Sequence, residues 1–521
     1  MTAGFDAAGR RVLVVCALGG FTTLLDNSVL NVAIPALRGS LRADATQMQW
    51  MVAGYSLAFG LALIPGGRLG DVRGRKPFFL AGMAIFTVGA ALAGSSPHPW
   101  ALVAARLLQG LGGGLVNSQM IGTMQDTFTG YARTRALGLY AVTGGVAGGL
   151  GPPLGGAVIG AVGPDAGWRL VLLLAVPCGV ITLVLAARHL PPPRAQAGSP
   201  DLDVVGLLLM GGLTLSLMLP FVQPSIGTAG LLWLPVVGAL AVSFFLWQHH
   251  YARSGRRPLV HPALARSAPF AAGTVVAMGY FGSGLAFSLV LVMFLQEGLG
   301  LSALAAAAVT LPSALSMVAS SALAWRAARR FGRYTVSVGL ALSAGFMLAS
   351  GLAGLLASRS HLPVLLALCG MCTSAASGLV IPPLQASVLQ HAPAEAAGVA
   401  GSILQMSQRI AAAVCISAVS GIYLHGSSAG ASGHRPAYWH AVLTCAGVAA
   451  FALLVSLLRT HGRPGLPSHG TRTVAETSAG QGSGARGGNR LAFYSIPTNN
   501  VDNCPRVPSG ACRTREGRAD R

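Results

Sequence analysis

The chain contains 521 residues, of which 53% are hydrophobic and only 9% are charged. Soluble proteins carry about 25% charged residues, so this composition excludes a large soluble enzyme and a disordered polyelectrolyte. The 35 Lys and Arg residues against 14 Asp and Glu residues give a net charge of +21, a value that is typical of nucleic-acid-binding proteins.

Apolar segments of about 20 residues, each long enough to cross a hydrocarbon layer of about 30 Å as a helix, follow one another along most of the chain. We therefore predict an all-α polytopic membrane protein with about fourteen transmembrane helices. Only a short polar break, 223–230, separates the seventh span from the eighth, so a count of twelve is the alternative. The predicted spans are 12–34, 48–68, 78–96, 100–122, 137–160, 168–187, 204–222, 229–247, 270–295, 301–322, 334–356, 363–389, 399–424 and 438–458.

The basic residues are distributed unequally over the segments between these spans. One alternate set of loops, counted with the residues that directly flank the first and the last span, holds 20 Lys and Arg residues, and the other set holds 4. Cytoplasmic loops carry the excess of positive charge in membrane proteins, so we predict that both termini are cytoplasmic. The net charge is then a topology signal, and we expect no nucleic-acid partner. No cleavable signal peptide is predicted, because a second span follows the first directly.

The first span contains an acidic residue, Asp26, where a charged side chain costs about 2.5–3.5 kcal/mol. Asn27 and Asn31 are four residues apart and share one helix face, and Asp26 borders that face. We interpret Asp26 as a carboxylate that binds and releases protons. The alternative is a structural carboxylate whose partners lie on neighbouring helices.

The segment 66–77, between the second and third spans, combines glycines with positive charges. Glycine permits tight turns, so the segment is predicted to be a cytoplasmic loop. Its Asp71 has the chemistry to pair with a basic group or to cap a helix. A positively charged loop with no further role is the alternative.

Three further spans carry unusual residues. Arg106 in the fourth span is a permanent cation that needs a carboxylate, backbone carbonyls or a substrate anion as its partner, and a structural ion pair is the alternative. Arg409 in the thirteenth span is expected to extend its charged end to the cytoplasmic face.

The fifth span has small residues at spacings of four around Pro152 and Pro153, which predicts a kinked helix that packs closely on its neighbours. Plain helix packing is the alternative there.

These segments together resemble the major facilitator superfamily, in particular its fourteen-helix branch of drug:proton antiporters. The resemblance covers residues 12–460. Segment 67–76 resembles the cytoplasmic gating motif of the superfamily, and 25–35 resembles the first-helix motif of the branch. Segment 106–110 resembles a helix-four motif whose arginine is implicated in proton transfer. Segment 151–156 resembles the antiporter motif of helix five, which exporters carry.

The resemblance implies a major facilitator fold, with two six-helix bundles around a central cavity and two inserted helices. The implied units are a cytoplasmic N-terminus (1–11), a first bundle (12–187), a linker with the two extra helices (188–269), a second bundle (270–461) and a disordered cytoplasmic tail (462–521). It implies proton coupling by Asp26 and Arg106. The implied cytoplasmic gate comprises Gly67, Gly70, Asp71, Arg73, Gly74 and Arg75, the antiporter helix Gly151, Pro152, Gly155 and Gly156, and the candidate substrate cavity Asn27, Asn31 and Gln109.

The implied function is proton-coupled efflux of small apolar or amphipathic compounds, as in drug or antibiotic resistance, by a monomer in the cytoplasmic membrane. Its partners would be protons, the small-molecule substrate and the lipid bilayer, and the few membrane carboxylates favour neutral or weakly charged cargo. A proton-coupled nutrient importer of the same fold and a non-transporting membrane sensor are the alternatives. The sequence contains no Walker loop, metal-ligand cluster or nucleophile elbow, so we expect no enzyme activity, cofactor or metal.

Overall fold

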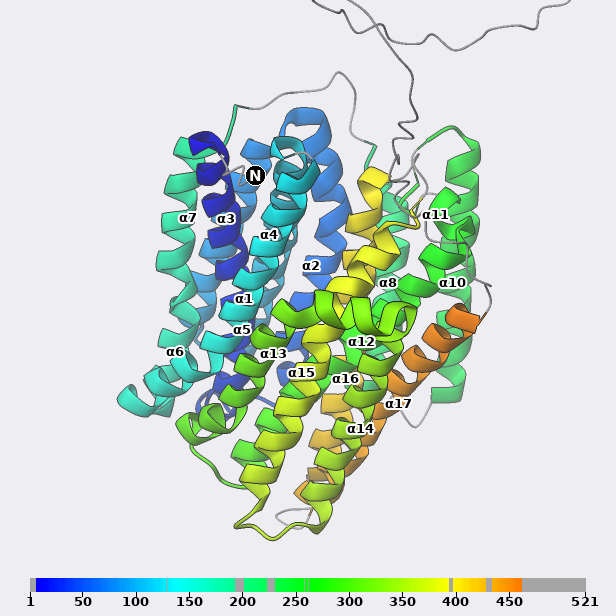
Figure 1. The fold of residues 1–521 in the computed structure, drawn as a ribbon. Coiled ribbons are helices and arrows are strands. Elements are labelled where there is room, and N and C mark those ends of the chain that lie inside the picture. Colours follow the sequence, from blue (N-terminus) through cyan, green and yellow to red (C-terminus); the bar gives the residue numbers. More distant parts are fainter. Residues whose placement is uncertain are drawn as a thin grey trace, which may run out of the picture. The chain divides into compact units, whose positions relative to one another are not determined.

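The computed structural model describes residues 6–128, 130–192, 201–222, 230–256, 258–260, 262–392, 397–427 and 433–461. Within these ranges the chain consists of helices joined by turns and short connections, and contains no strand (Figure 1). The predicted tail, 462–521, lies outside the described residues. Parts of the predicted linker, among them 193–200 and 223–229, also lie outside them.

Each predicted span overlaps one long helix or two consecutive helices. The helices of the first half are α1 (Ala7–Leu41), α2 (Ala45–Arg73), α3 (Arg75–Gly94), α4 (Pro99–Thr127), α5 (Gly130–Val162), α6 (Pro164–Leu173) and α7 (Ala175–His189). The segment between the halves forms α8 (Val204–Val222), α10 (Gly230–Arg253) and the short α11 (Pro262–Arg266). The second half contains α12 (Ala268–Met293), the π-helix η1 (Phe294–Gly298), α13 (Ala303–Phe331), the 3-10 turn η2 (Gly332–Tyr334), α14 (Thr335–Leu356), α15 (Leu362–Leu389), α16 (Ala397–Ser427) and α17 (His434–His461).

Ten helical segments of the described ranges are both long and apolar enough to cross a membrane. Large apolar side chains are exposed on the outer helices, such as Phe245 of α10 at 71% and Leu356 of α14 at 81%. Such exposure of apolar surface suits contact with lipid rather than with water. The chain is therefore a multi-pass membrane protein, as its sequence predicts.

Two helical bundles and an inserted pair make up the fold. In the first half, α2 and α3 pack on α4, and α1 packs on α5. In the second half, α13 and α14 pack on α15, and α12 packs on α16 and α17. The halves meet along two pairs of helices, α2 with α16 and α5 with α13. The inserted helices α8 and α10 pack on each other, and α8 also contacts α2 and α16. This is the fold that the resemblance implies, whereas the residue boundaries of its units stay predictions.

Several helices, among them α1 and α2, extend beyond the predicted spans because polar caps fix where they begin. At the start of α1, the backbone N–H of Gly9 donates to Asp6 Oδ1 at 2.9 Å. At the start of α2, Asp44 and Gln47 form a capping box in which each side chain accepts from the other residue's backbone N–H. Hydropathy detects only the apolar part of a helix, so the predicted spans of these helices are too short.

The prediction that residues 66–77 form a loop is wrong. Helix α2 continues to Arg73 and α3 begins at Arg75, so that only Gly74, with φ of 90°, leaves the helical conformation. The other glycines permit close packing instead of a turn. A Cβ at Gly70 would collide with the side-chain amide of Gln119 on α4. Glycine suits both a turn and a close helix contact, and only the neighbouring helix distinguishes the two cases.

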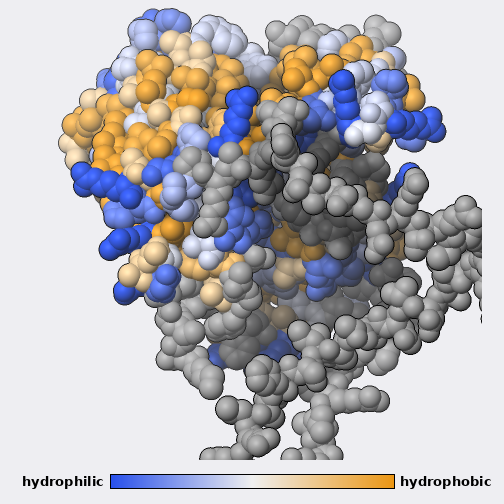
Figure 2. Space-filling model, turned by 90° about the horizontal axis from the view of Figure 1, so that it is seen from above, coloured by the Kyte–Doolittle hydropathy of each residue, from blue (hydrophilic) through white to orange (hydrophobic). Residues whose placement is uncertain are grey.

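We call the end of the bundles at which α1 begins the amino end, and the opposite end, at which α1 ends and α2 begins, the far end. Figure 2 looks onto the amino end and shows hydrophilic residues among hydrophobic ones on the surface of the helices. The amino end includes the start of α1, the end of α2 and the start of α3, whose Arg10, Arg11, Arg73 and Arg75 belong to the arginine-rich set that the sequence predicts to be cytoplasmic.

Candidate functional site

A buried cluster of three side chains joins α1 to α4. Arg106 Nη1 donates to Asp26 Oδ2 at 2.6 Å and to Gln109 Oε1 at 2.7 Å. Gln109 Nε2 donates to Asp26 Oδ1 at 2.8 Å. Arg106 and Gln109 are one helical turn apart on α4, which allows both to reach the same carboxylate. The sequence predicted Asp26 and Arg106 as candidates separately, and the structure brings them together.

The cluster is sealed from solvent on all sides. Asp26 and Arg106 are each 1% exposed, and Gln109 is fully buried. The Arg106 guanidinium carbon lies 4.4 Å from the centre of the Tyr55 ring of α2. Arg106 Nε and Nη2 have no hydrogen-bond partner within the described part of the chain. Aromatic contact stabilises a desolvated cation by up to about 2 kcal/mol, so Tyr55 partly replaces the missing hydrogen bonds.

The predicted cavity residues separate into two groups. Gln109 belongs to the buried cluster, where both its amide oxygen and its amide nitrogen are occupied. Asn27 and Asn31 are only partly buried and take no part in the cluster's hydrogen bonds. A role of Asn27 and Asn31 in substrate binding stays a prediction.

The predicted gate residues form a junction between α2, α3 and α4. Arg75 Nη2 lies 2.8 Å from Asp71 Oδ1, one turn earlier, and Arg75 Nε donates to Asp126 Oδ2 at the end of α4 at 2.5 Å. A Cβ at Gly122 of α4 would collide with the Arg75 guanidinium, so this glycine provides the space for it. Arg73 is exposed.

Two other gate-region side chains bind backbone carbonyls of distant segments. Arg68 donates to the Asp201 carbonyl at 2.7 Å and to the Pro258 carbonyl at 2.5 Å, on the segments that flank α8 and α10. Lys76 Nζ donates to the Ala187 and Leu190 carbonyls at the end of α7. A Cβ at Gly67 would lie 3.7 Å from Ser402 Oγ of α16, in ordinary contact with the second bundle. The gate segment therefore touches both bundles and the inserted pair.

The glycines of the predicted antiporter helix, α5, pack against two different helices. A Cβ at Gly151 would collide with Ser28 of α1, and one at Gly155 would lie 3.2 Å from the Val29 carbonyl. A Cβ at Gly156 would lie 2.9 Å from the Ala303 carbonyl and 3.0 Å from Leu304 Cα of α13, in the second bundle. The small residues of α5 thus allow close packing on α1 within the first bundle and on α13 of the second bundle.

Pro152 lies inside α5 without breaking the helix. Proline lacks an N–H, so the carbonyl four residues earlier, that of Gly148, loses its helical donor. The Ser28 hydroxyl donates to this carbonyl at 3.2 Å and to the Ala147 carbonyl at 3.3 Å. A side chain of α1 therefore satisfies the backbone group that Pro152 frees.

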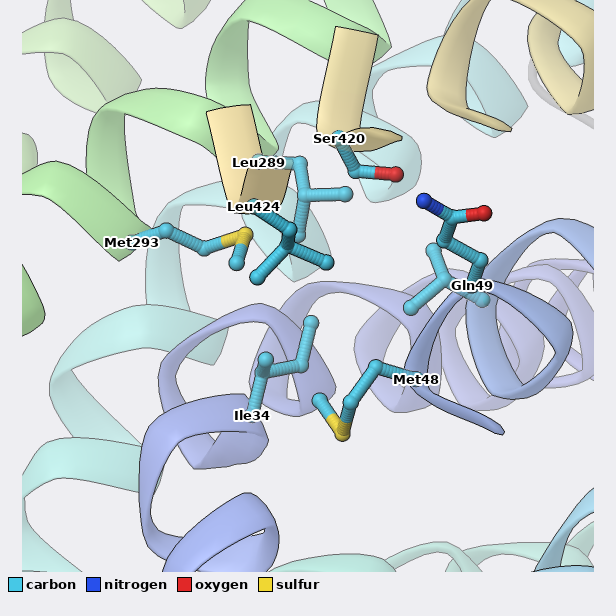
Figure 3. Close-up of a pocket in the computed structure, with 8 residues that line it drawn as sticks. Ile34, Met48, Gln49, Leu289, Met293, Ser420 and Leu424 are labelled. Carbon is cyan, nitrogen blue, oxygen red and sulfur yellow. The ribbon is translucent and has the colours of Figure 1, made fainter. Parts of the chain in front are cut away.

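At the far end, an ion pair joins the two bundles. Arg38 Nη1 of α1 lies 3.1 Å from Glu297 Oε1 and 3.2 Å from Glu297 Oε2 of η1. The adjacent Gln296 Nε2 donates to the Val32 carbonyl of α1 at 3.1 Å. The far end also holds a cavity of about 10 Å³, no larger than one water molecule (Figure 3). Its lining comes from both bundles and comprises Ile34, Met48, Gln49, Val52, Leu289, Met293, Ser420 and Leu424.

Sequence reasoning missed three features of the site. Tyr55 has no unusual sequence context, and nothing signals its contact with Arg106. Arg38 and Glu297 did carry a signal, since Arg38 is one of four basic residues on the arginine-poor side. The prediction that Arg409 reaches the cytoplasmic face is wrong. Its guanidinium carbon lies 4.3 Å from the centre of the Phe59 ring, midway along α2.

Comparison with known proteins agrees with these observations. The family model of the Major Facilitator Superfamily matches residues 16–415. The probable actinorhodin transporter of Streptomyces coelicolor is 36% identical over 326 residues, which cover 62% of this chain and 56% of that protein. The tetracenomycin C resistance and export protein of Streptomyces glaucescens is 30% identical over 410 residues, which cover 76% of this chain and 73% of that protein.

Solved structures share the fold at low sequence identity. The xylose transporter XylE from E. coli, in a partially occluded inward open conformation, superimposes with a TM-score of 0.60 at 15% identity. The superposition covers 88% of this chain and all of that chain. The family model, the relatives and the two-bundle fold lead to one conclusion: the chain belongs to the major facilitator superfamily.

Proposed function

We propose that this chain is a proton-coupled exporter that moves small apolar or amphipathic compounds out of the cytoplasm by alternating access. Its relatives include a resistance and export protein, which favours export over nutrient uptake or sensing. In this proposal both termini are cytoplasmic, the amino end faces the cytoplasm, the transporter works as a monomer, and the proton gradient drives it without a cofactor. The observation that carries the proposal is the buried Asp26–Arg106 ion pair between α1 and α4.

The ion pair provides a chemical basis for coupling. When Asp26 binds a proton, it loses its negative charge and no longer attracts Arg106. The neutral acid remains hydrogen-bonded to the Gln109 side chain. A charge that is buried without its partner is strongly destabilising, so Arg106 has to move or find another partner. Protonation therefore changes the relative stability of two arrangements of α1 and α4.

Asp26 exchanges its proton in only part of the transport cycle. Its carboxylate is fully buried here, and the far end is closed by the Arg38–Glu297 ion pair and the packing of α5 on α13. In the proposed cycle, opening of the far end admits water and a proton to Asp26, and opening of the amino end releases the proton to the cytoplasm. One proton entering across 100 mV supplies about 2.3 kcal/mol.

Growth of an inhibitor-sensitive host that lacks its own exporters tests the proposal. The host carries the wild-type chain, the Asp26→Asn variant or the matched control Asp165→Asn, which changes an exposed acid at the start of α6. We expect the wild type and the control to raise tolerance to at least one compound of a broad panel, and Asp26→Asn to abolish that gain. Immunoblots of membranes check that the three proteins reach equal levels.

Proton release gives the second measurement. In inverted vesicles, addition of a compound identified by the growth assay should release protons from the vesicle interior with the wild type and not with Asp26→Asn. Unchanged tolerance across the whole panel would overturn export. Proton movement that persists in Asp26→Asn would assign the coupling to another residue.

A further inference from the structure

A second arginine lies in the membrane interior at the boundary of the two bundles. Arg409 extends from α16, and its guanidinium covers the Phe59 ring of α2. The helices approach closely here, since a Cβ at Gly60 would lie 3.2 Å from Arg409 Cβ. Arg409 as a whole is partly exposed, whereas Arg106 is 1% exposed.

Arg409 has no carboxylate partner in the described ranges. The acid of the membrane interior in the first bundle, Asp26, is already neutralised by Arg106. The Arg409 guanidinium contacts an aromatic group, the Phe59 ring. A cation–aromatic contact offsets only part of the cost of a cation that has left water.

Polar groups of the first bundle lie one helical turn from the Phe59 ring that Arg409 covers, since a Cβ at Gly113 of α4 would lie 3.0 Å from this ring and Asn117 follows one turn later. The Asn117 amide of α4 donates from Nδ2 to the Tyr140 hydroxyl of α5 at 3.1 Å, which leaves the phenolic proton of Tyr140 free to be donated. Asn117 is 4% exposed, and its Oδ1 has no hydrogen-bond partner in the described part of the chain. The Tyr140 ring packs over Gly20 of α1, where a Cβ would collide with it.

We propose that Arg409 and Tyr140 bind the anionic group of the transported compound, and that the substrate class is aromatic organic acids. Arg409 supplies the positive charge, Tyr140 a hydroxyl donor, and Phe59 an aromatic ring, which is 1% exposed in this conformation and becomes accessible to the compound's ring when the bundles rock. Asn117 Oδ1 accepts from a hydroxyl group on the same compound. This inference rests on the proposed export function and replaces the sequence-based expectation of neutral cargo.

The charge of the cargo affects the driving force. When an anion leaves the cell and a proton enters, both movements follow the inside-negative membrane potential. Because Arg409 belongs to the second bundle and Tyr140 to the first, rocking of the bundles changes their separation. Such a site binds the anion with different affinity in the two states, which coupled transport requires.

Equilibrium binding to the purified full chain in lipid nanodiscs tests the inference. The probes are three matched pairs at alkaline pH: benzoate, naphthalene-2-carboxylate and anthracene-2-carboxylate, each with its neutral carboxamide. A charged hydrogen-bonded pair changes affinity by about tenfold or more, so at least one acid should bind that much more tightly than its amide. Arg409→Gln should abolish the preference without weakening amide binding, and Arg409→Lys should retain part of it.

Arg330→Gln, an exposed arginine near the end of α13, serves as the control and should leave the acid preference unchanged. The inference is overturned if no acid binds better than its amide, or if Arg409→Gln keeps the preference. Neither result depends on transport. The growth and proton-release assays with Asp26→Asn therefore judge export separately, and export of neutral compounds with no acid preference would retain the proposed function while rejecting this site.

Discussion

The chemistry of the buried cluster depends on its geometry at single atoms. One nitrogen of Arg106, Nη1, binds both Asp26 and Gln109, while Nε and Nη2 are buried without a hydrogen-bond partner in the described residues. Such an arrangement holds the arginine firmly only as long as Asp26 is ionised. Tyr55 makes the unpaired state less unfavourable, because its ring remains in contact with the guanidinium when the carboxylate is neutral.

Removal of one member of the pair should destabilise the protein more than removal of both charges. Arg106→Gln leaves the Asp26 carboxylate buried without a cation, at an expected cost of about 3–5 kcal/mol in the free energy of unfolding. The double variant Asp26→Asn, Arg106→Gln should regain most of this stability while remaining inactive in transport. Thermal unfolding in detergent, followed by intrinsic fluorescence, measures the stability. A loss below about 1 kcal/mol in Arg106→Gln would show that the pair is hydrated rather than buried.

Part of this cluster can be predicted from the sequence. Asp26 and Arg106 are conspicuous because ionisable groups are rare in apolar spans. The sequence places Gln109 in the candidate substrate cavity. Its amide carries no charge, so nothing in the sequence indicates that it binds the Asp26–Arg106 ion pair. Tyr55 and Arg409 depend on contacts between helices distant in sequence, which no local pattern reveals.

Helix α5 shows how a single element serves packing and motion. Its prolines remove backbone donors, and Ser28 of α1 restores one of the lost bonds. Its glycines allow α1 and α13 to approach from two sides. The sequence predicted the close approach and the kink from the spacing of Gly and Pro. It mistook the glycines of 66–77 for a turn, because the Gln119 and Ser402 side chains that face them lie on other helices.

Gly156→Ala should shift the protein towards conformations in which α5 and α13 are separated at the far end. The added Cβ would lie 2.9 Å from a backbone oxygen of α13, which cannot move as a side chain does. Overpacking of this kind costs about 1–3 kcal/mol, which corresponds to a change of about fivefold or more in the conformational equilibrium. Gly148→Ala is the matched control on the same helix, since its Cβ would meet nothing within 4 Å.

The shift is measured with a Ser420→Cys reporter in a background free of other cysteines, labelled from outside by a membrane-impermeant maleimide. Ser420 lines the far-end cavity and is 4% exposed in the closed form. Faster labelling with Gly156→Ala and unchanged labelling with Gly148→Ala are expected. Equal labelling rates in the two variants would show that the contact between α5 and α13 does not hold the far end closed.

Across the molecule, two kinds of contact hold the bundles together. Close helix packing joins α2 to α16 and α5 to α13. The far end adds polar contacts, namely Arg38–Glu297 and the Gln296–Val32 hydrogen bond. The sequence predicted the two-bundle fold from the spans and motifs. The polar closure was not predicted, because it joins residues about 260 positions apart that meet only after the bundles assemble.

Glu297→Gln should raise the population of molecules whose far end is open. The ion pair is partly exposed, with side chains 37% accessible for Arg38 and 15% for Glu297, so its contribution should be about 1 kcal/mol or less. Labelling of Ser420→Cys should then accelerate by up to about fivefold. The charge-reversed pair Arg38→Glu, Glu297→Arg should restore the slow rate, whereas Arg42→Gln, which alters an exposed arginine at the same end, should have no effect.

High salt should accelerate labelling of the wild type and leave Glu297→Gln unaffected, because screening weakens only the intact ion pair. If the charge-reversed pair labels as fast as Glu297→Gln, closure depends on the individual side chains and not on their electrostatic attraction. The packing of α5 on α13 then keeps the far end closed.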